Sequence, residues 1–183
     1  HSGVLKIIVT RGSGGRGYKY EENMIPTIIL IISAMPIYSE KKLLKGVNVK
    51  FCKTKMSNNI NIAGFKHLNR LDSVLARSEW TKKEIFEGLI TDSQNNVIEG
   101  TMTNIFTLTN NILYTPIINE IGIKGIMREI VIEKFGNYFR DIVQCELSKE
   151  QLLNSESVFL TNSVVKIVPV RNIQGKIFRI DER

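Results

Sequence analysis

EGLITDSQNNVIEGTMTNIFTLTNNILYTP, residues 87–116, is the stretch that decides the fold class. It contains four short segments rich in β-branched and apolar residues, with an Asp- and Asn-rich turn at 92–96 and a second turn at Asn110–Asn111. Asn and Asp tolerate turn conformations, whereas β-branched residues favour strands. The stretch therefore predicts a meander whose strands cover residues 87–91, 97–100, 104–109 and 112–116.

Strand patterns continue on both sides of this meander. Residues 4–10 are apolar and β-branched, residues 46–52 alternate in a half-buried pattern, and the run at 27–35 predicts a buried strand. The C-terminal stretch 157–178 predicts two further strands around a turn at Asn172–Gly175.

Helical periodicity occurs in three places. A helix is expected from His67 to Trp80, with Lys66 at its N-terminal edge and an inner face of Leu68, Leu71, Val74 and Leu75. A second helix should run from Gly125 to about Phe139, with an inner stripe of Ile126, Ile130, Val131 and Phe135. Ser148–Gln151 has the spacing of a capping box for a short third helix. This mixture predicts an α+β fold with a mostly antiparallel or mixed sheet.

Composition indicates one globular protein with a sizeable core and a preference for anions. The 183 residues are 43% hydrophobic and 23% charged, and their formal net charge is +7. The basic residues are spread along the chain, so a small anionic substrate is favoured over nucleic acid or a membrane surface. The longest apolar run, at 25–37, is too short to span a bilayer. Cys52 and Cys145 lie far apart and no metal-ligand spacing occurs, which predicts a reduced, cytoplasmic protein without a metal site.

The loop RGSGGRGY, residues 11–18, matches the dinucleotide-binding spacing G-x-G-x-x-G. That site needs a helix directly after the loop and an acidic residue about 20 positions further on, and the sequence offers neither. The loop retains two cations and a phenol, Arg11, Arg16 and Tyr18, on a flexible backbone. Such a loop can bind the carboxylate of a small acid, or it can be an exposed turn with solvated arginines.

Three further segments, KHLNRLDSVLARSEW (66–80), VIEGTMTNIF (97–106) and GIKGIMREIVIE (122–133), give a family resemblance together with this loop. They resemble the fold type IV pyridoxal-phosphate enzymes, which include branched-chain and D-amino acid aminotransferases and aminodeoxychorismate lyases. The resemblance implies a D-amino acid aminotransferase-like fold. Residues 39–183 would form its C-terminal, cofactor-binding domain, and residues 1–38 would be the end of an N-terminal α+β domain that carries the substrate loop.

The resemblance also implies roles for residues at the cofactor ring. Lys66 would be the lysine that binds the cofactor covalently, which needs a free amine. Glu99 would pair with the pyridine nitrogen and keep the ring an electron sink. Ile123 would press on one face of the ring, and Asn69 would have an orienting role.

Residues at the two ends of the site follow from the same resemblance. The phosphate would bind at the helix start formed by Gly125, Ile126 and Met127, because backbone N–H groups at a helix N-terminus favour an anion. Asn162 and Ser163 would add a second phosphate contact. Arg16 and Tyr18 would bind the substrate carboxylate, and Arg11 would assist or brace the loop.

Within the family, RGSGGRGY, KHLNRL and GIMR are most similar to the lyase branch. The implied reaction converts 4-amino-4-deoxychorismate to 4-aminobenzoate and pyruvate in folate biosynthesis. A D-amino acid or branched-chain aminotransferase is the alternative, because it would need the same Lys66 and Glu99. A basic binding protein without chemistry is a more distant alternative. Family members form homodimers and carry a longer N-terminal domain, so we expect a dimer, and this short polypeptide could be inactive alone.

Overall fold

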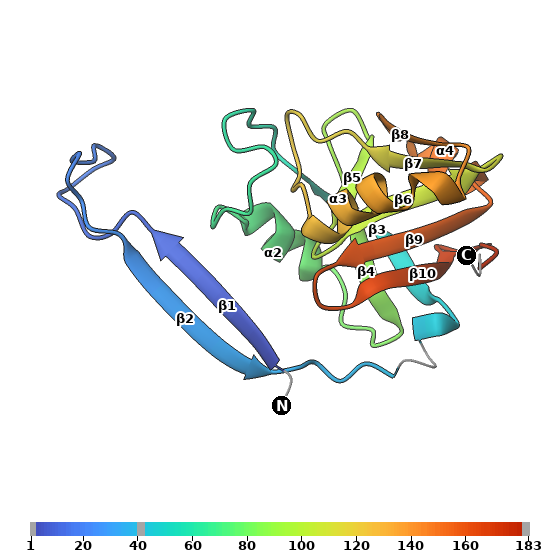
Figure 1. Cartoon of the computed structure of the whole chain (residues 1–183), viewed down its shortest axis with the longest axis horizontal. Helices are drawn as coiled ribbons and strands as arrows, with labels where there is room; N and C mark the ends of the chain where they lie inside the picture. The colour runs from blue at the N-terminus through green and yellow to red at the C-terminus, as the bar shows by residue number, and fades with distance from the viewer. Residues whose placement is uncertain (1–2, 40–42, 181–183) are drawn as a thin grey trace. The chain divides into compact units, whose positions relative to one another are not determined.

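The computed structural model describes residues 3–39 and 43–180. The chain divides into two compact units, His1–Tyr38 and Ser39–Arg183 (Figure 1). The expected domains, residues 1–38 as the end of an N-terminal α+β domain and residues 39–183 as a cofactor-binding domain, stay a prediction.

The first unit is a single antiparallel hairpin. β1 (Gly3–Thr10) pairs with β2 (Thr27–Ala34) in a register that sets Thr10 opposite Thr27. The intervening residues 11–26 form turns and irregular structure without a helix, as the sequence predicted for the glycine loop. The expectation that β2 is buried is wrong, because every residue of β2 is exposed. Two strands alone have no second layer to cover either face.

The second unit is built on one mixed sheet with the strand order β5-β4-β3-β10-β9-β6-β7-β8, and β11 pairs with β10. β3 is parallel to β4 and β10, and β7 is parallel to β8, whereas the other pairs are antiparallel. The strands are β3 (Val47–Lys55), β4 (Ile85–Thr91), β5 (Val97–Gly100), β6 (Asn104–Thr109), β7 (Ile112–Pro116), β8 (Asp141–Cys145), β9 (Ser157–Asn162), β10 (Lys166–Ile173) and β11 (Lys176–Ile177). The α+β class with a mixed sheet is confirmed. β8 was not predicted, and the C-terminal stretch forms three strands instead of two.

The predicted meander is only partly correct. β4 pairs with β5 and β6 pairs with β7, as expected, but β5 and β6 are not neighbours in the described sheet. β6 instead pairs with β9, which sets Asn104 opposite Thr161. The sheet curls, so that β5 still contacts β6 and β7 although they stand far apart in the strand order. The tight turn between Gly100 and Thr103 lies where the curl brings these strands together.

The helix after Lys66 differs from the prediction in length and in its buried face. α2 covers only Leu71–Arg77, so Lys66 lies on the preceding loop. Its buried residues are Ser73 and Ala76, and small residues on this face allow the helix to pack against β3 and β4. The expected inner face is exposed, by 65%, 64%, 62% and 50% at Leu68, Leu71, Val74 and Leu75.

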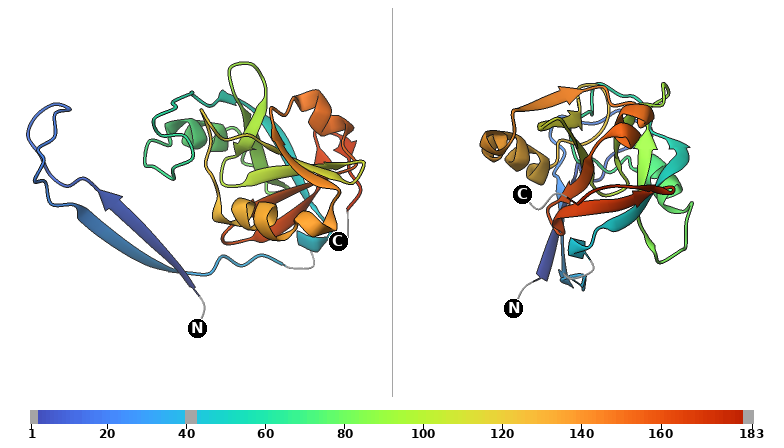
Figure 2. Two further views of the ribbon diagram at one scale, coloured as in Figure 1. Left: turned by 45° about the horizontal axis from the view of Figure 1, so that its top comes forward. Right: turned by 90° about the vertical axis from the view of Figure 1, so that its right-hand side faces the viewer.

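The other two helices lie on the outside of the curled sheet (Figure 2). α3 (Ile126–Lys134) ends earlier than predicted and is followed by a 3-10 turn, η1 (Gly136–Tyr138). Val131 is buried and Phe135 half-buried as expected, but Ile126 and Ile130 are exposed. Arg128 is buried instead. α4 (Lys149–Asn154) starts with the predicted capping box, in which the Gln151 N–H donates to Ser148 Oγ and the Ser148 N–H donates to Gln151 Oε1.

The main core is formed by apolar side chains of β3, β4, β5, β6, β9 and β10, and Leu152 of α4 packs into it. These side chains lose nearly all contact with water. This burial makes the sheet a rigid platform for the polar residues on β4, β5 and β6. The central members are Val49, Leu89, Ile105, Leu160 and Val170.

Candidate functional site

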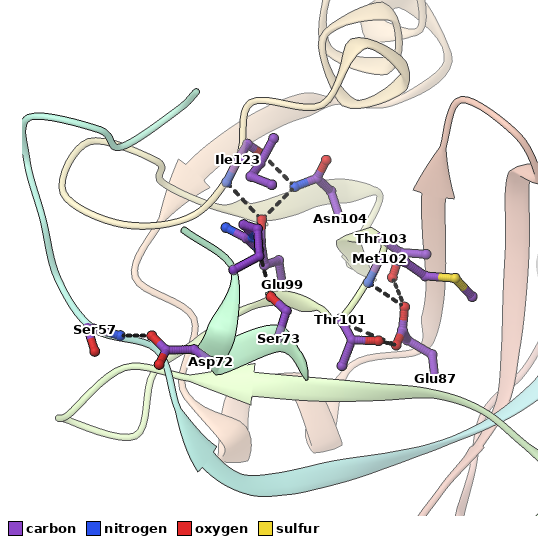
Figure 3. A network of polar contacts seen from close by, with 11 residues as sticks. Ser57, Asp72, Ser73, Glu87, Glu99, Thr101, Met102, Thr103, Asn104 and Ile123 are labelled. Atoms are coloured by element: carbon purple, nitrogen blue, oxygen red, sulfur yellow. Dashed lines mark hydrogen bonds and ion pairs between the residues drawn. The ribbon is translucent and has the colours of Figure 1, made fainter. Parts of the chain in front are cut away.

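Glu99, on β5, lies at the centre of the polar network in Figure 3. Its side chain is only 3% exposed. Glu99 Oε1 accepts a hydrogen bond from Arg70 Nη2 at 2.9 Å, and Oε2 accepts one from the Ile123 N–H at 2.8 Å. Burial raises the pKa of Glu99 above its ordinary value, and the bond from Ile123 and the charges of Arg70 and Lys66 offset only part of this increase. A buried carboxylate fixed through both oxygens is a well-oriented partner for a cationic ring N–H.

Asn104, the first residue of β6, fixes the other side of Ile123. Its Nδ2 donates to the Ile123 carbonyl oxygen at 2.8 Å and lies 3.5 Å from Glu99 Oε2. Both backbone polar groups of Ile123 are therefore bound by side chains of the sheet (Figure 3). These hydrogen bonds fix the position of the loop before α3 relative to the end of β5.

The same loop positions the segment that leads to Lys66. The Gly64 N–H donates to the Gly122 carbonyl oxygen at 2.9 Å, and the Lys124 N–H donates to the Gly64 carbonyl oxygen at 3.1 Å. Lys66 follows two residues later and is exposed. Its charge lowers the pKa of Glu99, so the amine lies within electrostatic reach of the buried carboxylate. The fold thus brings Lys66, Glu99 and Ile123 together from three separate segments.

The start of α3 has the features of an anion-binding helix end. Gly125 is the N-cap residue and provides no side-chain cap for the first N–H groups. A Cβ at Gly125 would lie 2.1 Å from Asn104 Oδ1, so a residue without a side chain is needed for this close approach to β6. Ile126 is 70% exposed and Met127 is half-buried. The uncapped backbone donors of the first turn are consistent with a bound phosphate.

The end of β9 lies beside this helix start, because Thr161 pairs directly with Asn104. Asn162 Nδ2 donates to the Met102 carbonyl oxygen at 3.1 Å, and its Oδ1 accepts from the N–H groups of Val164 and Val165. The Asn162 side chain therefore holds the turn, and Ser163 next to it is exposed. Thr161 Oγ1 is buried and has no hydrogen-bond partner among the described residues.

These features meet the requirements of pyridoxal phosphate at both ends. Lys66 provides an amine, Glu99 a buried carboxylate, and α3 a helix start for the phosphate. Buried hydroxyls nearly always have a partner in native proteins. The unpartnered Thr161 hydroxyl, on the strand beside that helix start, therefore indicates that a group from outside the chain completes its hydrogen bonding.

Glu87, on β4, supports the turn between Glu99 and Asn104. It is fully buried. Its Oε1 accepts from the Gly88 N–H and from the N–H and hydroxyl of Thr101, and its Oε2 accepts from the Met102 N–H and the Thr103 hydroxyl. Five donors over 2.6–3.1 Å hold one carboxylate, so the turn is fixed to the sheet (Figure 3).

The roles of Arg70, Glu87 and Asn104 are not predicted by the sequence. Each occurs within or close to a segment that carries the resemblance, but its partner is distant in the chain. Asn104 and Ile123 are 19 residues apart, and Arg70 and Glu99 are 29 apart. One local signal could have indicated a buried polar contact. Glu87 is a charged residue within an otherwise apolar strand segment, where a charge needs hydrogen-bond partners.

The expected substrate residues belong to the first unit. Arg11, Arg16 and Tyr18 are all exposed on the hairpin loop. The Arg11 guanidinium lies 3.5 Å from the centre of the Tyr20 ring, a cation–π contact within the loop. This contact is compatible with the bracing role expected for Arg11. The roles of Arg16 and Tyr18 stay predictions, and Asn69 is exposed without a contact that assigns it a role.

Two other site types are absent from residues 3–39 and 43–180. No cluster of three or more His, Cys, Asp or Glu side chains that could hold a metal ion occurs in these ranges. No helix described there is long and apolar enough to cross a membrane. A polar cavity of about 250 Å³ is lined by Asp92, Asn96, Glu120 and Glu146 among others, and neither Lys66 nor Glu99 lines it.

Comparison with known proteins gives the family context of this arrangement. Residues 1–173 match the family model for Amino-transferase class IV. The chain is 30% identical over 180 residues to aminodeoxychorismate lyase from Vibrio harveyi, an alignment that covers 98% of this chain and 66% of that protein. It is also 30% identical over 173 residues to a putative branched-chain-amino-acid aminotransferase from Methanocaldococcus jannaschii, covering 94% of this chain and 59% of the relative.

Solved structures show the same fold. The crystal structure of 4-amino-4-deoxychorismate lyase from Pseudomonas aeruginosa superposes with a TM-score of 0.94 at 36% identity, over 98% of this chain and 67% of that one. The branched-chain amino acid aminotransferase from Escherichia coli has a TM-score of 0.81 at 22% identity, over 97% and 57%, and is similar in fold alone. The predicted fold type is thereby confirmed. The chain spans about three fifths to two thirds of the length of these relatives.

Proposed function

Because this chain belongs to the class IV aminotransferase family, we propose that the full-length protein is a pyridoxal-phosphate enzyme that acts as a 4-amino-4-deoxychorismate lyase. Its products would be 4-aminobenzoate and pyruvate, used in folate biosynthesis. The observation that carries this proposal is the buried Glu99 carboxylate, held between Arg70 and Ile123 within reach of Lys66. The names of the Vibrio harveyi and Pseudomonas aeruginosa relatives, together with RGSGGRGY and GIMR, favour the lyase reaction.

Lys66 and Glu99 would perform the chemistry at the cofactor ring. When bound, pyridoxal phosphate supplies an electron sink for negative charge at the substrate carbon that carries the amine. Glu99 would bind the ring nitrogen and keep it protonated. The Lys66 amine would take the proton from the amine-bearing carbon and later return one to the departing pyruvate carbon. Loss of the enolpyruvyl group leaves an aromatic ring, whose stability favours the forward direction.

The two ends of the site would bind anionic groups. The N–H groups after Gly125, together with Ser163 and the Thr161 hydroxyl, would hold the cofactor phosphate. Arg16 and Tyr18 would hold a carboxylate of the substrate, a dianion that suits the net charge of +7. We propose a cytoplasmic homodimer for the full-length enzyme.

An aminotransferase is the second candidate. The match to a putative branched-chain aminotransferase at the same 30% identity favours it, and Lys66 and Glu99 serve both reactions equally. A binding protein without chemistry is disfavoured by membership of an enzyme family.

Product analysis of the full-length protein separates the two reactions. Purified protein would be incubated with 4-amino-4-deoxychorismate, and separately with D-alanine or a branched-chain amino acid and 2-oxoglutarate. The proposal predicts equal amounts of 4-aminobenzoate and pyruvate in the first reaction and no sustained transamination in the second. Sustained transamination without 4-aminobenzoate would overturn the lyase assignment, and a Lys66→Ala variant provides the inactive control.

A further inference from the structure

Arg70 makes the one ion pair described for Glu99. Its Nη2 lies 2.9 Å from Glu99 Oε1 and also donates to Ser73 Oγ at 2.8 Å. Arg70 directly precedes α2, and its side chain is 23% exposed, against 3% for that of Glu99. The Arg70 side chain therefore connects the buried carboxylate with the solvent-exposed part of the site. Desolvated charge-assisted contacts of this kind are strong.

The two oxygens of Glu99 differ in the donors that surround them. Oε2 accepts from the Ile123 N–H at 2.8 Å and lies 3.5 Å from the Asn104 amide. Oε1 accepts from Arg70. Each carboxylate oxygen can accept two hydrogen bonds. Among the described contacts, the remaining acceptor capacity is thus on Oε1, beside the guanidinium.

Three cationic side chains interact electrostatically with Glu99. Lys66 lowers its pKa, but the proposed function requires the amine of Lys66 to react and lose its charge. Arg128 interacts with Glu99 electrostatically, but its Nη1 is paired with Glu129. Burial and the charge of Arg70 lower the pKa of the neighbouring His67. Arg70 directly contacts the carboxylate, and a guanidinium is not deprotonated in proteins.

We propose that Arg70 is a positioning residue that keeps Glu99 ionised and thereby sets the protonation state of the cofactor's pyridine nitrogen. The inference rests on the proposed function. In the pair formed by Glu99 and a ring nitrogen, the shared proton can sit on either partner. A cation in contact with the carboxylate stabilises the arrangement in which the carboxylate is negative and the ring nitrogen holds the proton. Without that cation, burial favours the neutral carboxylic acid and an unprotonated ring.

The test measures the pKa of Glu99 in the cofactor-free, full-length protein. The carboxyl carbons of glutamate are labelled with ¹³C, and the Glu99 resonance is assigned from its loss in Glu99→Gln. An opposite charge at this distance lowers a carboxyl pKa by about one to three pH units. Arg70→Met should therefore raise the pKa of Glu99 by that amount, and Arg70→Lys should restore most of the difference. Arg77→Met, on the neighbouring helix but bonded to the Trp80 carbonyl oxygen, should leave it unchanged.

A second readout uses the loaded protein. The acid limb of the pH profile of turnover should move upward in Arg70→Met, in the same direction as the Glu99 pKa, and return in Arg70→Lys. Equal Glu99 pKa values in wild type and Arg70→Met would overturn the inference, as would an Arg70→Lys variant as strongly shifted as Arg70→Met. Borohydride reduction of the wild type distinguishes failure of this inference from failure of the proposed function. If only the role of Arg70 is wrong, the wild type still forms an adduct at Lys66. If the proposed function is wrong, no adduct forms there.

Discussion

The Asn104 side-chain amide donates to the Ile123 carbonyl oxygen over 2.8 Å, while the Ile123 N–H donates to Glu99. One residue of the loop before α3 is thus bound on both sides by side chains from β5 and β6. This clamp fixes the loop that pairs with Gly64, and through it the segment that carries Lys66. The distance between amine and carboxylate is therefore determined by the sheet and the loop together.

Asn104→Ala should weaken this clamp. It leaves the Ile123 carbonyl oxygen without its donor in a partly buried position, which typically costs about 1–3 kcal/mol. We expect the free energy of unfolding to fall by that amount in urea titrations and the cofactor to dissociate more readily. Asn69→Ala removes the same side chain from an exposed position and should change stability by less than about 0.5 kcal/mol. Equal effects of the two substitutions would contradict the clamp.

Gly125→Ala should separate α3 from β6. The added Cβ would lie 2.1 Å from Asn104 Oδ1, so the helix start or the Asn104 side chain must move. Overpacking of this kind costs about 1–3 kcal/mol, and displacement of the phosphate donors should raise the cofactor's dissociation constant. Gly136→Ala is the matched control, because no atom lies within 4 Å of the Cβ built there. Thermal unfolding and fluorescence titration with cofactor measure both effects.

Glu87→Gln should loosen the turn between Glu99 and Asn104. The new amide nitrogen is a donor, and each carboxylate oxygen of Glu87 already faces donors, so at least two contacts are lost or become repulsive. Because hydrogen bonds to charged groups contribute about 1.5–3 kcal/mol, we expect a loss of at least about 2 kcal/mol in urea unfolding. Glu84→Gln, at an exposed position three residues earlier, should be nearly neutral. A stable Glu87→Gln protein would show that the turn does not depend on this carboxylate.

Glu79 should make the fold sensitive to acid. Burial alone would raise its pKa, but hydrogen bonds from the N–H groups of Lys53 and Thr54 and from Lys50 outweigh burial and lower the pKa to about 2. A carboxyl whose pKa is lower in the folded protein adds stability above its unfolded value of 4.5, and that contribution disappears as the pH falls toward 2. Wild type should therefore lose more stability than Glu79→Gln between pH 6 and pH 3. Parallel stability curves over this range would contradict the prediction.

Local patterns predicted most of the elements but not their arrangement. The strands followed from β-branched runs between Asn-rich turns, and the capping box at Ser148 followed from four residues. The pairing of β6 with β9 joins segments far apart in the chain, so no local pattern indicates it. The apolar periodicity of α2 predicts that its leucine and valine side chains face the core, whereas the residues it buries are Ser73 and Ala76. Periodicity identifies two faces of a helix, and tertiary packing decides which one is buried.

The candidate site shows the same division. Lys66, Glu99 and Gly125 were identified through resemblance, because a single lysine or glutamate carries no local signal of its role. Their convergence depends on contacts such as Asn104–Ile123 and Gly64–Gly122, which form only in the folded chain. Arg70 lies within KHLNRL, but only its contact with Glu99 in the folded chain indicates a role for it.

The proposed function requires that Lys66 bind pyridoxal phosphate covalently. The full-length protein would be incubated with the cofactor, reduced with borohydride, digested and analysed by mass spectrometry, with Lys66→Ala treated in parallel. The account predicts a phosphopyridoxyl group on the peptide that contains Lys66, and an absorption band near the visible edge that the variant lacks. An unmodified Lys66 in a folded, full-length protein, or modification spread over surface lysines in both proteins, would contradict it.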